Sequence, residues 1–86
     1  MMNLIGRYIN NLNKEQVNNF LLSKNINLNN DELDFTYDFI KKNWNQVLSN
    51  PNLEYFDKYK NKYSLDNFNK LKKLANEYLQ KYENYL

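Results

Sequence analysis

The apolar residues between positions 33 and 48 recur at the spacing of an α-helix, and this pattern constrains the fold more than any other feature of the chain. The strongest positions step by four, three, four and three residues: Leu33, Tyr37, Ile40, Trp44 and Val47. Residues at these intervals share one helix face. Acidic residues gather at the start of the segment and lysines near its end, as the helix dipole favours. The sequence therefore predicts a long, central helix that starts at Asn29 or Asn30.

Two shorter helices are predicted before it. An apolar stripe favours a helix over residues 4–12, in which Gly6 costs about 1 kcal/mol relative to alanine. Asn13 then has the chemistry of a helix cap, and Gln16 stands three residues later in the capping-box position. This second helix should end near Lys24 and Asn25, because asparagine tolerates the left-handed conformation.

The remaining segments complete a helical pattern. Residues 26–28 alternate as a short extended connector that carries Ile26 and Leu28 inward. Pro51 marks a break, because the residue before a proline is driven out of the helical region. A fourth helix is expected after it, with an apolar stripe that includes Tyr59 and Tyr63. Ser64 is a suitable cap for a last helix over residues 65–82.

Five helical segments joined by short connections predict an all-α fold, a small helical bundle of four to five short helices. Eighty-six residues without a linker or a repeat are expected to form a single domain over 1–86. The 12 basic and 10 acidic residues nearly balance, so the net charge does not indicate a particular class of partner. Residues 1–12 lack the continuous apolar stretch of a signal peptide, and no segment has the length of a membrane span. We expect a cytoplasmic protein that does not enter a membrane.

The composition offers few candidate catalytic residues. The chain has no histidine, no cysteine and one glycine, which removes the commonest general base, thiolate chemistry and glycine-rich phosphate loops. We therefore expect no enzyme activity, no catalytic residues and no cofactor. The only carboxylate cluster is Asp31, Glu32, Asp34 and Asp38. A Mg²⁺ or Ca²⁺ site there is one interpretation, but an acidic first turn that complements the helix dipole is the preferred one, so no metal site is predicted.

Lysine and tyrosine alternate in the second half of the chain and form the candidate interaction surface. Its residues are Tyr55, Tyr59, Lys60, Lys62 and Tyr63. Tyrosine is enriched in the cores of protein interfaces, which favours a protein-interaction module that binds an unknown partner or a second copy. The alternative is a nucleic-acid-binding protein, because single-strand binders combine basic residues with aromatic stacking platforms. A third interpretation is that these rings fill the core.

A helix-turn-helix motif over the second and third helices is disfavoured. The recognition helix of such a motif would begin with Asp31, Glu32 and Asp34, which would face the phosphates.

The order of caps and connectors resembles domain-of-unknown-function family 2624, a family of short Firmicute proteins. The resemblance rests on residues 9–17, on residues 25–29 before the long helix, and on Ser64 opening a last helix that ends in Lys81 and Tyr82. The chain departs from the family at residues 43–45, which replace a basic residue followed by glycine. The resemblance implies a cytoplasmic, helical, bacterial protein and supplies no functional residues.

Overall fold

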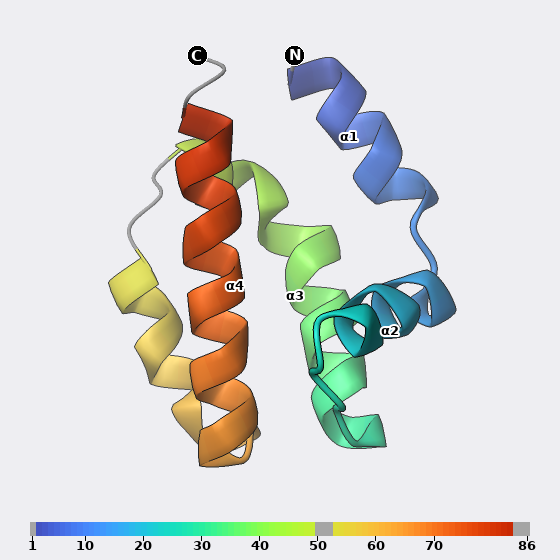
Figure 1. The fold of residues 1–86 in the computed structure, drawn as a ribbon. Helices are drawn as coiled ribbons and strands as arrows, with labels where there is room; N and C mark the ends of the chain where they lie inside the picture. The colour runs from blue at the N-terminus through green and yellow to red at the C-terminus, as the bar shows by residue number, and fades with distance from the viewer. Residues whose placement is uncertain (1, 50–52, 84–86) are drawn as a thin grey trace.

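The computed structural model describes residues 2–49 and 53–83, and every regular element in these two ranges is a helix (Figure 1). The elements are α1 (Met2–Asn11), α2 (Lys14–Ser23), α3 (Asn30–Ser49), the 3₁₀ helix η1 (Leu53–Lys62) and α4 (Leu65–Glu83). The predicted all-α class is thus confirmed. The break predicted at Pro51 lies outside the described residues.

The long helix α3 is the centre of the fold. It contacts α1, α2 and η1, and η1 in turn contacts α4. Figure 1 shows α1 and α2 on one side of α3, with η1 and α4 on the other. The predicted central position of this helix is confirmed. Since α3 is shared by both sides, its apolar residues stabilise two separate packing interfaces.

The caps of α2 form as the sequence predicts. Asn13 accepts a hydrogen bond from the backbone N–H of Gln16 at 2.8 Å, and the Gln16 side chain accepts one from the Asn13 N–H at 2.9 Å. At the other end Asn25 has a φ of 63°. The N–H groups of Asn25 and Ile26 donate to the carbonyls of Leu22 and Leu21, which is the Schellman pattern of a helix end.

The best-buried part of the core lies between residues 26–28, α2 and α4. Its fully buried cluster consists of Val17, Leu21, Ile26, Leu28 and Leu71. The connector residues 26–28 turn two apolar side chains inward, as expected, and Ile26 is only 2% exposed. Leu21 and Leu71 bring α2 and α4 together at this end.

The fourth helix differs from the prediction in its geometry. In a 3₁₀ helix, residues three apart lie above one another, so Phe56, Tyr59 and Lys62 form one row along η1. The sequence predicted a fourth helix with an apolar stripe that included Tyr59 and Tyr63. The structure forms a 3₁₀ helix that ends at Lys62, so Tyr63 lies just beyond it. The row with a spacing of three places Phe56 and Tyr59 against the aromatic residues of α3.

The first helix is attached to α3 through its C-terminal carbonyls. The ammonium group of Lys41 donates to the carbonyl oxygens of Ile9, Asn10 and Leu12 at 3.0, 2.8 and 3.3 Å. The Ile9 and Asn10 carbonyls belong to the last turn of α1 and the Leu12 carbonyl follows it, so the lysine acts as a cap supplied by a neighbouring helix, in addition to the Leu12 N–H that donates to the Ile9 carbonyl at 3.1 Å. The Tyr37 hydroxyl also donates to the Leu12 carbonyl, at 3.1 Å.

Gly6 lies where α1 comes closest to α3. A Cβ atom at this position would stand 3.1 Å from two ring carbons of Trp44. The glycine therefore permits close packing of the indole ring against α1.

Replacing Lys41 with methionine should loosen α1 specifically. The variant keeps the apolar stem but loses the ammonium group, so we expect a loss of about 1–2 kcal/mol in the stability of α1 docking. Hydrogen exchange of the α1 amides measures this loss. The matched control is Lys42→Met, because Lys42 is exposed and its replacement should stay within about 0.5 kcal/mol. Equal protection of α1 in both variants would contradict the capping role.

Candidate functional site

The predicted interaction surface is divided between an inner aromatic cluster and an outer row of lysines. Tyr59 is half-buried, with its ring 5.1 Å from that of Phe35 and 5.5 Å from that of Phe39. Tyr63 is also half-buried, and its ring lies 5.8 Å from Phe35. The side chain of Tyr55 lies outside the described residues.

The lysines of the predicted interaction surface are exposed to solvent, outside the aromatic cluster. Lys60 and Lys62 are exposed, and the Lys62 ammonium stands 5.9 Å from the centre of the Phe35 ring. The aromatic rings thus join η1 to α3, whereas the lysines cover the outer side of that contact. Tyr59 and Tyr63 meet in one cluster together with Phe56, and Lys60 points away from it.

The acidic cluster at the start of α3 is not arranged as a metal site. Within residues 2–49 and 53–83, no group of three carboxylates is placed to hold a metal ion. Asp34 forms an ion pair with Lys14 at 2.5 Å. Asp31 and Asp38 are exposed, which fits the expected acidic first turn, but Glu32 is only 3% exposed. The sequence analysis treated all four carboxylates alike and missed the separate role of Glu32.

The buried Glu32 carboxylate joins the starts of two helices. One oxygen, Oε1, accepts hydrogen bonds from the Asn29 N–H and from the Asn67 amide, both at 2.9 Å. The other, Oε2, accepts one from the Ser64 N–H at 2.8 Å. Asn29 closes a capping box by accepting from the Glu32 N–H at 2.8 Å. A single side chain therefore fixes the N-terminal ends of α3 and α4 against each other.

Electrostatics at this junction favour the ionised carboxylate. Burial by itself would raise the pKa of Glu32, but two backbone N–H groups and one side-chain amide stabilise the charged form. The net effect holds the pKa of Glu32 below its ordinary value of 4.5. Glu32 is thus a structural anchor that stays charged at neutral pH.

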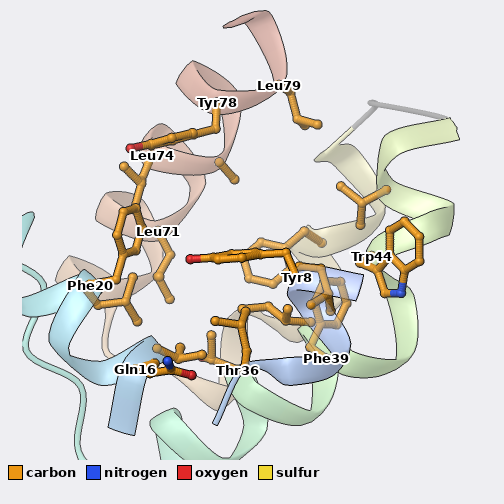
Figure 2. Close-up of a pocket in the computed structure, with 18 of the residues that line it drawn as sticks. Tyr8, Gln16, Phe20, Thr36, Phe39, Trp44, Leu71, Leu74, Tyr78 and Leu79 are labelled. Carbon is orange, nitrogen blue, oxygen red and sulfur yellow. The ribbon is translucent and has the colours of Figure 1, made fainter. Parts of the chain in front are cut away.

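Between the two sides of the fold lies an apolar groove of about 530 Å³. Figure 2 shows Phe20 and Tyr78 together at one side of it, Trp44 at the opposite side and Tyr8 between them. All five elements contribute to its lining: Tyr8, Ile9, Leu12, Gln16, Val17, Phe20, Leu21, Thr36, Phe39, Ile40, Trp44, Val47, Phe56, Tyr63, Leu71, Leu74, Ala75, Tyr78 and Leu79. Protein interiors are close-packed with few voids larger than a water molecule, so this space is an open site.

Three polar side chains that line the groove, Gln16, Thr36 and Tyr63, have partners within the protein. The Thr36 hydroxyl donates to the Glu32 carbonyl at 2.7 Å and therefore accepts from the Tyr63 hydroxyl, at 2.6 Å. Burial raises the pKa of Tyr63 to about 12, so its phenol keeps this proton at neutral pH. The Gln16 side chain is held by its own helix cap. What the groove offers to a ligand is therefore mainly apolar surface.

Several residues of the groove are more exposed than core residues should be. Tyr8, Phe20 and Tyr78 are 66%, 43% and 41% exposed. Helical periodicity places Phe20 and Tyr78 on the apolar faces of α2 and α4. The same periodic signal marks a buried face and a groove wall, so only the relative placement of the helices distinguishes the two. Of the predicted surface residues whose side chains the structure describes, Tyr63 alone lines the groove.

Comparison with protein families, with curated proteins and with solved structures found no match to this chain. The resemblance to domain-of-unknown-function family 2624 therefore stays a prediction. None of the described helices combines the length and the apolar character needed to span a bilayer.

Acid should unfold the protein in part through Glu32. Its pKa in the folded state lies below the ordinary value of 4.5, so the carboxylate contributes its full stabilisation above pH 4.5. This contribution is lost as the pH falls through the folded pKa. Glu32→Gln removes the charged acceptor, and we expect a loss of about 2–3 kcal/mol at pH 7.

Urea unfolding of wild type and Glu32→Gln between pH 7 and pH 3 tests this expectation. The difference between the two proteins should shrink as the pH falls. The control is Asp31→Asn, because Asp31 is an exposed neighbour and its loss should stay within about 0.5 kcal/mol. A difference that is small at pH 7, or that grows towards acid, would refute the anchoring role.

Proposed function

We propose that this protein is a non-enzymatic interaction module that binds a helix of a partner protein in the apolar groove. The observation that carries the proposal is the groove itself, an apolar space of about 530 Å³ in a chain of only 86 residues. Large exposed apolar patches in small proteins mark interaction sites. The expected cytoplasmic location and the absence of catalysis stay predictions.

The dimensions and shape of the groove support a helix as the occupant. Its lining runs from Thr36 to Val47 on α3 and from Leu71 to Leu79 on α4, which at 1.5 Å per residue corresponds to about 17 and 12 Å. That is two to three turns, the length over which an amphipathic helix presents anchors at i, i+3, i+4 and i+7. With α3 as the floor and other helices as walls, a bound helix would complete a bundle.

Binding of nucleic acid is less well supported. The tyrosine rings that would serve as stacking platforms, Tyr59 and Tyr63, are engaged with the aromatic residues of α3. Lys72 is paired with Asp57 at 2.6 Å, and Lys70 with Asp66 at 3.2 Å. Single-strand recognition needs both free rings and free cations, so this arrangement favours the protein-interaction proposal.

A substitution that fills the groove should increase the stability of the fold and weaken the binding of a helical peptide. Ala75 is half-buried and lines the groove, so Ala75→Phe places a ring in the empty space. We expect the free energy of unfolding to rise by about 1 kcal/mol, because cavity-filling changes stabilise. Affinity for an uncharged amphipathic helical peptide should fall at least tenfold. Trp44 is the only tryptophan and lines the groove, so its fluorescence reports binding.

The matched control is Leu65→Gln, because Leu65 is 64% exposed and is not part of the groove lining; it should bind the peptide like wild type. Light scattering completes the experiment. A monomer that binds the peptide supports the proposal, whereas a monomer that does not bind it at millimolar concentration overturns it. A dimer that Ala75→Phe dissociates would assign the groove to a second copy and would also overturn it.

A further inference from the structure

Two lysines stand over one edge of the groove. The Lys24 ammonium lies 5.8 Å from the centre of the Phe20 ring and 5.9 Å from that of Tyr78. The Lys81 ammonium lies 5.1 Å from the same Tyr78 ring. Phe20 and Tyr78 pack edge to face with their centres 5.8 Å apart. The lysines and the two rings together form what we call the basic edge: Phe20, Lys24, Tyr78 and Lys81.

Among the residues whose side chains the structure describes, neither lysine of the basic edge has a carboxylate within 4.0 Å; the ion pairs found there use Lys14, Lys70 and Lys72. Their charges are thus available to a ligand. Both ammonium groups lie over the faces of aromatic rings that line the groove, which holds them near its opening by cation–π attraction.

Four carboxylates on the helices that line the groove project away from it. A helix turns about 100° per residue, so Glu15 of α2 projects about 170° away from the residues of α2 that line the groove. By the same geometry Glu77 of α4 projects about 130° away, and Asp34 and Asp38 of α3 about 140° or more. The helix α1 contains no acidic residue. The opening of the groove along these helices is therefore apolar in its interior and positive at one edge.

We infer that the groove selects an acidic amphipathic helix, one whose apolar face is flanked by glutamate or aspartate on the side that meets the basic edge. This inference rests on the proposed function and names the chemistry of its partner. The apolar face supplies most of the affinity. The carboxylates fix the orientation of the helix, because Lys24 and Lys81 stand together at one edge of the groove.

Three synthetic peptides without tryptophan or tyrosine test the inference. They share one leucine face and differ only at the flanking positions, which carry glutamate, glutamine or lysine. Exposed ion pairs contribute modestly, so we expect the glutamate peptide to bind about tenfold more tightly than the glutamine peptide and the lysine peptide to bind most weakly, as measured by Trp44 fluorescence. At 1 M salt, where the screening length is about 3 Å, the difference should vanish.

Charge reversal locates the effect on the protein. K24E/K81E should lose the preference for the glutamate peptide and bind the lysine peptide best. The matched control is K42E/K73E, which changes the net charge equally at two exposed lysines on faces of α3 and α4 turned away from the groove, and it should keep the preference. If both double variants shift equally, the basic edge is not responsible and the inference is overturned.

The remaining outcomes separate this inference from the proposed function. Equal binding of all three peptides would overturn the acidic partner while the helix-binding groove stands. Binding of none would overturn both. Oleate, titrated below the concentration at which it forms micelles, is the test for an acyl chain. Tighter binding of oleate than of any peptide would make a hydrocarbon the occupant and would overturn the inference.

Discussion

The fold depends on one buried carboxylate. Glu32 accepts hydrogen bonds from the Asn29 and Ser64 backbones and from the Asn67 side chain, so it fixes the beginnings of α3 and α4 at a common point. An isolated buried charge would be costly, but here each oxygen has a donor. The two helices are held together at this end, and the groove lies further along them, where their apolar faces are not covered.

Aromatic residues serve two purposes in this small protein. Phe35, Phe39 and Tyr59 join η1 to α3 through edge-to-face and tilted contacts, which provide a core for one half of the chain. Phe39 also contributes to the groove. A chain of this length buries a limited share of its surface on folding. The apolar side chains that remain partly exposed along the groove therefore leave a sizeable part of its apolar surface unburied. Binding of an apolar helix would complete that burial.

Local chemistry explains which features could be predicted from the sequence. The capping box of Asn13 and Gln16 and the left-handed Asn25 depend on neighbouring residues only, and both were predicted correctly. The role of Glu32 depends on Ser64 and Asn67, which lie 32 and 35 residues away, so no local sequence pattern predicts it. The groove was missed for a similar reason: a helical stripe fixes which face is apolar but not whether another helix covers it. In η1 the two rings that contact Phe35 and Phe39, those of Phe56 and Tyr59, are three residues apart, as the 3₁₀ geometry requires for residues on one row.

The way α1 is attached has a consequence for the range of partners. This helix is held by Lys41 and by the contact of Gly6 with Trp44, and neither attachment involves the Glu32 junction. The α1 wall is therefore attached independently, and an outward shift of α1 would leave the junction of α3 and α4 intact. A groove with one adjustable wall accommodates side chains of different volume, at the energetic cost of repositioning a ten-residue helix. Such a protein would recognise a class of helices that share a charge pattern and would tolerate variation in their apolar residues.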